Sequence, residues 1–469
     1  MRHARPTLER RTAAGTTTST PPACLVRRPS CHPCSFCGPS MYPPKNELDT
    51  LATSVQETRE GSEESRMSQT KDELIVTPDV MEVPDGGAKA WLTVVGAYVI
   101  GSVEQYYYTR EYLPGQTPSS ISWIGSFQIM MPFLVGVVSG KLFDNGKFHL
   151  VEISGGLIFV FSVFMLSLAK PHQYYQGVGM GLGLGLTFVP TVSINVHHFK
   201  RRRGLAAGIG LSGSSVGATV FPISDHLLPK IGFASTVRAT GYIVLGCLVI
   251  GNSMMRTRLP PRSQRPGAVE PPPITTFFKD AAYMWAVLGA LISTLGFYFP
   301  IIYLQLFAVQ HSVDGNLAFY SIAILNGASA FGRVIGNHFA DVYGPYNIQV
   351  PTGMMTGATI LAVLGVHNGA SLIVVSILYG LLSVWLSLAF SVLAALARSH
   401  DEVGARIGLA LALSSFGSLG SAPIQGALLT DRFLWTRPIV FSGVAMFVGC
   451  ACFSVTRMMQ AKRLGTQKV

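Results

Sequence analysis

The sequence predicts an all-α membrane protein with twelve transmembrane helices in two six-helix halves, the first helix being shortened. Three observations predict this class. Only 13% of the 469 residues are charged and 49% are hydrophobic, too few charges to coat a soluble globule of this size. Apolar segments of about twenty residues, the length that crosses a bilayer, follow one another from Trp91 onward. Finally, an internal repeat relates the two halves.

Residues 1–83 are rich in Pro, Ser, Thr, Arg and Glu and show no sustained apolar period, which predicts a disordered cytosolic tail. This tail contains the run CHPCSFC, with His32 beside cysteines at C-x-x-C-x-x-C spacing. A zinc site needs four ligands on a scaffold that orders them. We therefore expect no metal here, and initiation at Met41 or Met67 is the alternative explanation of this segment.

Eleven spans of bilayer length are predicted after the tail. A shorter segment, Trp91 to Val103, precedes them and reaches Glu104 after about thirteen residues, where roughly twenty are needed. The predicted spans are 121–143, 150–169, 174–196, 203–223, 236–255, 282–308, 318–340, 348–366, 371–396, 404–427 and 437–456.

The cations of the net +11 charge indicate orientation rather than nucleic-acid binding, because they sit in short clusters between apolar runs. Alternate links carry most of them, as cytoplasmic loops do, so both termini are expected in the cytosol, with the plasma membrane as the expected location. The predicted parts are a first half at 84–256, a basic Pro-rich linker at 257–280, a second half at 281–457 and a tail at 458–469.

The repeat appears when the chain is shifted by 200 residues, which lays GLAAGIGLSGSSVG (204–217) on GARIGLALALSSFG (404–417). The fifth and eleventh spans are therefore expected to be equivalent, in two parallel halves related by an axis along the membrane normal.

The same stretch contains a G-x-S-x-G match, Gly213 to Gly217. A nucleophile elbow needs a strand before the serine, but these serines lie inside an apolar segment, so we expect no enzyme. Gly204, Gly208, Gly213 and Gly217 have instead the spacing that lets membrane helices approach closely. Gly177, Gly181 and Gly185 predict the same for the fourth span.

Arg333 is the main candidate for substrate binding. It lies about fifteen residues into the eighth span, where a charge costs about 2.5 to 3.5 kcal/mol, and helical spacing puts Asn326 and Ser329 on its face. A guanidinium binds a carboxylate through a bidentate fork, so the three residues predict an anion site. The alternative is a structural cation held by backbone carbonyls or by a carboxylate on another span.

Other polar residues in the spans are weaker candidates. Gln128 and Tyr298 are retained for substrate binding, although helix packing is the expected role of most buried polar groups. The remaining candidates of this kind are Asn195, Tyr303, Gln305, Trp385 and Gln425.

Asp144 and Asp341 lie in equivalent links after the second and eighth spans. Pairing of these carboxylates with cations would hold one conformation closed. Their predicted partners are Arg202, Arg203 and Arg398.

Four motifs in order resemble the fungal branch of the monocarboxylate porter family, within the major facilitator superfamily: PDGGAKAWLTVVGAY, SSISWIGSFQ, FKRRRGLAAGIGLSGSSVGATVFP and NGASAFGRVIGNHFADVYGPYN. The resemblance covers Asp85 to about Arg457. It implies twelve-span secondary transport by alternating access, with Arg333 at the position of the family's eighth-span arginine. Animal proton-coupled members carry an aspartate where this chain has Ser329, and a lysine that Trp91 to Val103 lacks.

We therefore expect a secondary transporter that moves a small organic anion or a carboxylate-bearing metabolite, without a cofactor and with protons as a candidate coupling ion. One alternative is an efflux pump for a secondary metabolite. The other is a non-transporting sensor or inactive relic, because the first span and the link before Gly177 are short against the family pattern.

Overall fold

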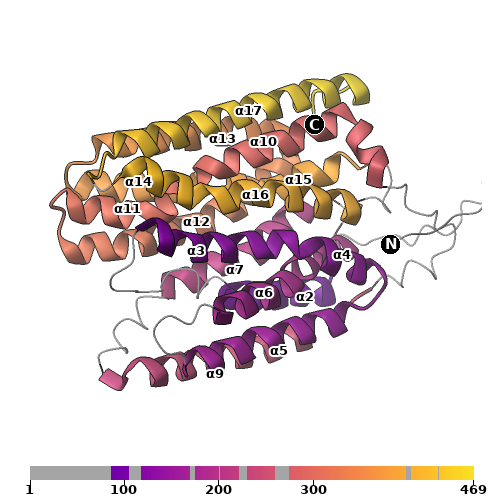
Figure 1. The fold of residues 1–469 in the computed structure, drawn as a ribbon. Helices are drawn as coiled ribbons and strands as arrows, with labels where there is room; N and C mark the ends of the chain where they lie inside the picture. Colours follow the sequence, from indigo (N-terminus) through magenta and orange to yellow (C-terminus); the bar gives the residue numbers. More distant parts are fainter. Residues whose placement is uncertain are drawn as a thin grey trace, which may run out of the picture. The chain divides into compact units, whose positions relative to one another are not determined.

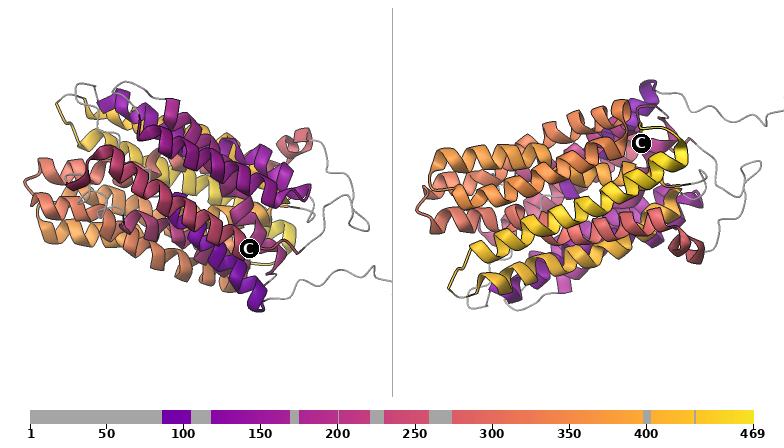
Figure 2. Two further views of the ribbon diagram at one scale, coloured as in Figure 1. Left: turned by 90° about the horizontal axis from the view of Figure 1, so that it is seen from below. Right: turned by 90° about the horizontal axis from the view of Figure 1, so that it is seen from above.

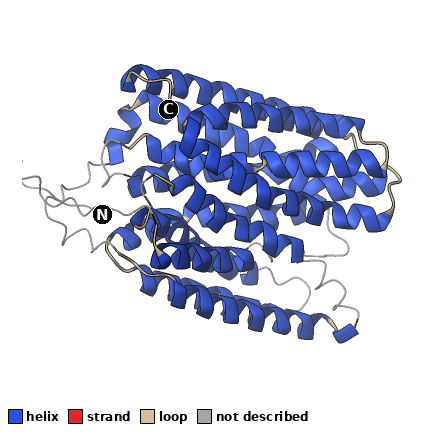
Figure 3. Cartoon of the chain, turned by 180° about the vertical axis from the view of Figure 1, so that it is seen from behind, coloured by secondary structure: helices blue, strands red, loops and turns tan. Residues whose placement is uncertain are grey.

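The computed structural model describes residues 86–104, 118–168, 175–199, 201–220, 230–258, 274–397, 403–430 and 432–469. The chain divides between Pro78 and Asp79, and all described residues belong to the second unit. In this part of the chain every regular element is a helix (Figure 3). The CHPCSFC run lies outside the described residues.

The helices of the first half follow the predicted spans closely. They are α2 (Ala88–Glu104), α3 (Pro118–Leu134), α4 (Gly136–Asp144), α5 (Phe148–Leu166), α6 (Tyr175–Ser193), α7 (Arg203–Val220) and α9 (Phe233–Met254), with a short 3-10 helix η2 (Ile194–His197) after α6. The two segments α3 and α4 together form the second predicted span.

The second half begins with the 3-10 helix η4 (Ile274–Lys279). Its α-helices are α10 (Ala281–Phe297), α11 (Phe299–Gln310), α12 (Gly315–Tyr343), α13 (Pro345–Ala362), α14 (Gly369–Leu382), α15 (Val384–Ala395), α16 (Val403–Leu429) and α17 (Thr436–Leu464). The pairs α10–α11 and α14–α15 each form one predicted span. Helix α17 continues eight residues beyond the predicted span end at 456.

Nine helical stretches among the described residues are long and apolar enough to cross a membrane. The helices of the first, fourth and fifth predicted spans are not among these nine, because they are too short or not apolar enough. Helix α2 has 17 residues, about 25 Å at 1.5 Å per residue, which is longer than the sequence predicted and still shorter than the roughly 30 Å hydrocarbon core. The all-helical membrane fold is confirmed, and the count of twelve crossings stays a prediction.

Two of the paired segments are interrupted for identifiable reasons. The turn at Tyr298 precedes Pro300, which cannot donate a backbone hydrogen bond. At Ser383 the hydroxyl donates to the carbonyl of Gly380 at 2.6 Å, a local bond that competes with the helical pattern. Both interruptions place polar side chains in the interior of the second half.

Two groups of helices form this unit, one from each half of the sequence (Figures 1 and 2). The groups meet where α7 packs along α12 and where α3 and α4 pack along α16. Within each group the first helix packs on the helix that carries the repeat, α2 on α7 and α10 on α16.

The 200-residue repeat is visible in these contacts. A Cβ atom on Gly217 would overlap the carbonyl of Ser102 on α2, and one on Gly417 would overlap the carbonyl of Leu291 on α10. Equivalent glycines therefore let equivalent helix pairs touch through their backbones, as the small-residue spacing predicted.

The glycine face of α6 confirms the second prediction of close packing. A Cβ on Gly185 would lie 2.6 Å from Cβ of Val135, and one on Gly181 would lie 3.1 Å from Cβ of Met131, both beside the second predicted span. Side chains with a Cβ would force these helices apart.

Candidate functional site

The site lies at the contact between α7 and α12, which come from opposite halves. Gly208 of α7 makes this contact close, because a Cβ there would lie 2.6 Å from the carbonyl oxygen of Arg333 and 2.9 Å from Cβ of Asn337. The absence of a side chain at Gly208 lets the long Arg333 side chain reach past the surface of α7 rather than being displaced from it.

Arg333 is half-buried and bonds across the contact to α7. Its Nη1 donates to the carbonyl oxygen of Leu211 at 2.6 Å and to Oγ of Ser214 at 2.5 Å. Its Nε is buried and finds no hydrogen-bond acceptor among the described residues. The guanidinium therefore joins the two halves in this conformation. Its Nε–H remains a buried donor to which an acceptor group could bind.

This geometry matches the alternative prediction for Arg333, a structural cation held by backbone carbonyls, since the carbonyl of Leu211 accepts its hydrogen bond. That contact does not use the whole guanidinium, and a carbonyl is a weaker partner for a cation than a carboxylate or enolate oxygen. An anionic ligand could therefore compete for the same group.

Tyr298 is the predicted residue that the fold brings toward Arg333. It lies at the interruption between α10 and α11, is 7% exposed, and lies within electrostatic range of the Arg333 guanidinium. The interruption at Pro300 is what places this side chain in the interior. Tyr298 and Arg333 are contributed by different helices of the second half.

The other predicted ligands contact their own helix or a neighbouring one. The Asn326 amide donates to the carbonyl of Ile322 one turn earlier on α12 at 2.9 Å. Gln128 lies on α3 beside Gly181 of α6. Ser329 is 1% exposed, accepts a hydrogen bond from Ser215 at 3.1 Å and shares one with Ser383 at 2.6 Å. Ser329 thus joins α7, α12 and the interruption before α15.

At the end of α12 the Asp341 carboxylate contacts the first turn of α7. Oδ1 accepts the backbone N–H of Gly204 at 2.9 Å and Oδ2 accepts that of Leu205 at 2.8 Å. The first N–H groups of a helix have no intrahelical partner and favour a negative charge. Asp341 of one half therefore caps a helix of the other half.

The sequence predicted arginine side chains as the partners of Asp341. Arg202 and Arg203 are exposed, and Arg203 adds a favourable electrostatic interaction with the carboxylate. The hydrogen bonds described above, however, come from the backbone N–H groups of Gly204 and Leu205. The side chain of Asp144 and all of Arg398 lie outside the described residues, so their predicted roles stay predictions.

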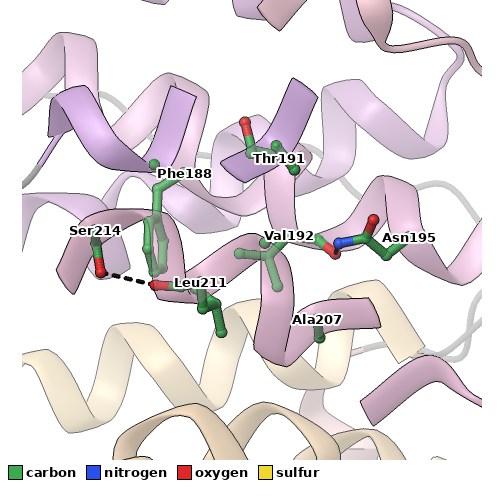
Figure 4. A pocket seen from close by; sticks show the side chains of 10 residues that line it. Phe188, Thr191, Val192, Asn195, Ala207, Leu211 and Ser214 are labelled. Atoms are coloured by element: carbon green, nitrogen blue, oxygen red, sulfur yellow. Dashed lines mark hydrogen bonds between the residues drawn. The ribbon is translucent and has the colours of Figure 1, made fainter. Parts of the chain in front are cut away.

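A small cavity lies beside the contact of Arg333 with α7, between α2, α6, η2 and α7 (Figure 4). It has room for a group about the size of a water molecule. Ser214, the partner of Arg333, lines it. The other lining residues are Ala97, Gly101, Phe188, Thr191, Val192, Asn195, Ala207, Gly210 and Leu211.

Several weaker candidates act in helix packing, as expected of buried polar groups. The hydroxyl of Tyr303 donates to the carbonyl of Ala422 at 2.9 Å, and the Gln425 amide donates to the carbonyl of Leu295 at 2.8 Å. These bonds join α10 and α11 to α16.

Sequence reasoning missed two buried charged groups. Glu152 on α5 is 1% exposed and accepts a hydrogen bond from Thr191 of α6 at 3.1 Å. Arg406 at the start of α16 is 3% exposed and donates to Asp280 at 3.1 Å. The signal for Glu152 was a single carboxylate inside an apolar run, and the signal for Arg406 was a cation within the predicted span 404–427.

Ser214 and Ser215 lie within α7, without the strand that a nucleophile elbow requires. Among the described residues, no group of three His, Cys, Asp or Glu side chains could hold a metal ion. The contacts of this site join the two helical halves around the half-buried Arg333 cation.

Comparison with known proteins identifies this arrangement. A profile of the Major Facilitator Superfamily matches residues 90–397. The chain belongs to the major facilitator superfamily.

Named relatives of this facilitator are fungal. It is 34% identical over 401 residues to the aspyridones efflux protein apdF of Emericella nidulans, covering 81% of each chain. It is 33% identical over 410 residues to MFS-type transporter 1 of an Ophiocordyceps species, covering 81% of this chain and 89% of that protein. The fujikurins efflux protein of Gibberella fujikuroi is 32% identical over 401 residues, with 81% and 85% covered.

A solved facilitator shares the fold. The crystal structure of the fucose:proton symporter FucP of E. coli superposes with a TM-score of 0.57 at 12% identity, covering 78% of this chain and 96% of that one. At this identity the likeness extends to the fold alone. The chain is thus a multi-pass membrane protein of a transporter superfamily.

Proposed function

We propose that this facilitator exports an acidic secondary metabolite by alternating access, with Arg333 as the group that holds the anion. The observation that carries the proposal is the Arg333 guanidinium, which lies at the contact between the halves with a buried Nε that has no acceptor among the described residues. A cation at this depth of a membrane helix is costly, and such residues mark substrate or ion pathways.

The direction of transport is supported by the relatives. Two of them are named for the efflux of fungal metabolites, aspyridones and fujikurins. The resemblance of the sequence motifs to monocarboxylate porters supports an anionic group on the substrate, since that resemblance implies that Arg333 stands at the family's position for a carboxylate. We infer that Tyr298, Asn326 and Gln128 lie around the anion, and that Ser329 serves the helix contact.

Alternating access requires an end that closes and opens. We infer that the Asp341 cap on α7 closes the cytosolic end, because the basic residues Arg201 to Arg203 at the start of α7 favour the cytosol. In this conformation the cap is formed, and we infer that it shuts the cytosolic entrance at the α7–α12 contact. A substrate anion that drew Arg333 away from Leu211 and Ser214 would loosen the same contact.

The test is efflux of radiolabelled benzoate, an aromatic acid, from yeast cells that express the facilitator at a measured surface level. Arg333→Gln removes the charge and is expected to reduce efflux about ten- to a hundredfold, the loss of one charge-assisted hydrogen bond. Arg333→Lys keeps the charge without the planar fork, so its efflux rate is expected to lie between those of the wild-type protein and Arg333→Gln. Undiminished efflux by Arg333→Gln at equal surface expression would contradict the proposal.

A further inference from the structure

The Asn195 amide is the polar end of the cavity between α2, α6 and α7. Its side chain is 2% exposed. Its Nδ2 donates one long hydrogen bond, 3.4 Å, to the carbonyl of Val192, and its Oδ1 has no partner among the described residues. An amide has two N–H donors and one acceptor oxygen. Asn195 therefore keeps a donor and an acceptor unused beside an open volume.

The cavity adjoins Arg333 through shared residues. Ser214 lines the cavity and also accepts the hydrogen bond from Nη1 of Arg333. Leu211, whose carbonyl is the second partner of Arg333, lines the cavity as well. A ligand whose anion replaced these partners would thus have its adjoining atoms beside the residues that line the cavity.

We propose that this cavity is a second substrate subsite, in which the Asn195 amide hydrogen-bonds a hydroxyl group of the acid whose anion Arg333 holds. The inference rests on the function proposed above and narrows the substrate class to hydroxylated acids. A hydroxyl matches the amide because it both donates and accepts. It also matches the size of the cavity, which holds a group as small as water.

Other groups fit less well. A methyl group has the right size but leaves the buried amide unpaired, which costs the desolvation of that group. A second anionic group would lie near Thr191, whose hydroxyl donates to the buried Glu152 carboxylate, and would lose its hydration without a cation lining the cavity. The Phe188 ring and the small residues Ala97, Ala207 and Gly210 restrict the rest of the volume.

The experiment compares efflux of three radiolabelled aromatic acids from yeast: benzoate, meta-hydroxybenzoate and meta-methylbenzoate. The last two differ only in a hydroxyl or a methyl of similar size. The wild-type protein is expected to export the hydroxy acid about three- to tenfold faster than the methyl acid, the effect of one buried hydrogen bond. Asn195→Leu, with nearly the same shape, is expected to remove or reverse that preference.

Two further variants keep the test decisive. Ala207→Val fills the cavity from α7 without altering Asn195, so it is expected to abolish the preference while benzoate is still exported, even where Asn195→Leu does not fold. Asn252→Leu removes an amide on α9 that pairs with His149, and is expected to keep the wild-type preference. Thermal unfolding of each purified variant reports folding.

The outcomes separate the two proposals. A hydroxyl preference that Asn195→Leu and Ala207→Val remove supports the subsite. Export of both substituted acids at equal rates, or a preference that survives these variants, overturns the subsite and leaves the proposed function standing, with the cavity holding water only. Export of none of the three acids overturns the acidic substrate class together with the subsite.

Discussion

Asp341 on α12 caps the first turn of α7 by accepting the backbone N–H groups of Gly204 and Leu205. The two helices belong to different halves of the facilitator, so the cap is a contact that must break when the halves move apart at this end. Gly204 is part of the mechanism, because a Cβ there would lie 2.6 Å from Oδ1 of Asp341.

Asp341→Asn is expected to favour the conformation that is open at this end. The asparagine amide can accept one N–H but lacks the negative charge. An anion at a helix N-terminus contributes about 0.3 to 2 kcal/mol, so its loss lowers the ratio of closed to open protein by up to about thirtyfold. The measurement is labelling of a Ser214→Cys reporter, in a background without the native cysteines, by a membrane-impermeant thiol reagent added to inside-out vesicles.

The matched control is Asp314→Asn at the other end of α12. Asp314 also caps a helix, accepting the N–H of Leu317 at 3.0 Å, but within α12 itself. The substitution therefore changes the same chemistry without crossing the halves, and labelling should stay at the wild-type rate. Equal labelling of the two variants would show that the Asp341 cap does not control access.

Gly208→Ala is expected to lower the stability of the α7–α12 contact. The added Cβ would meet the backbone carbonyl of Arg333 and Cβ of Asn337, and overpacking costs typically about 1 to 3 kcal/mol. Gly246→Ala on α9 is the control, since nothing lies within 4 Å of its Cβ position, and alanine favours a helix over glycine by about 1 kcal/mol. Thermal unfolding in detergent should move in opposite directions for the two variants.

The helices and their glycine contacts could be predicted from the sequence because both depend on local patterns. An apolar run of about twenty residues needs no knowledge of its neighbours, and the spacing from Gly204 to Gly217 marks a helix face whatever packs on it. The repeat that contains Gly217 and Gly417 is also visible in the sequence, because equivalent close contacts between helices require small residues at equivalent positions.

The partners of the site residues could not be predicted in the same way. Arg333 bonds to a carbonyl and a hydroxyl that lie 122 and 119 residues away, and backbone groups carry no signature in the sequence. Asp341 was matched with arginines because they are the visible cations, while its hydrogen bonds come from backbone N–H groups. The cavity at Asn195 depends on the packing of three helices, which side-chain identity alone does not specify.

Arg406 and Asp280 provide a test of buried charge pairing in the second half. Arg406 also lies 4.7 Å above the ring of Phe277, and Asp280 has a second cation, Arg463, at 3.8 Å. Asp280→Leu removes the carboxylate that pairs with the buried Arg406, and loss of one partner of a buried ion pair costs about 3 to 5 kcal/mol, whereas replacing both partners by apolar residues is often neutral. Asp280→Leu is therefore expected to unfold at a markedly lower temperature than the double variant Arg406→Met, Asp280→Leu. A double variant less stable than Asp280→Leu would contradict this account.

Ser329 distinguishes packing from substrate binding on α12. Its hydroxyl lies in a chain with Ser215 and Ser383, so Ser329→Ala is expected to leave buried hydroxyls unpaired and to destabilise the protein by about 1 to 3 kcal/mol. Ser321→Ala is the control, because Ser321 is equally buried and donates only to Ala318 on its own helix. The KM for benzoate efflux should be unchanged in both. A raised KM for Ser329→Ala with wild-type thermal stability would instead place this hydroxyl against the substrate, because loss of a packing contact lowers stability before it alters affinity.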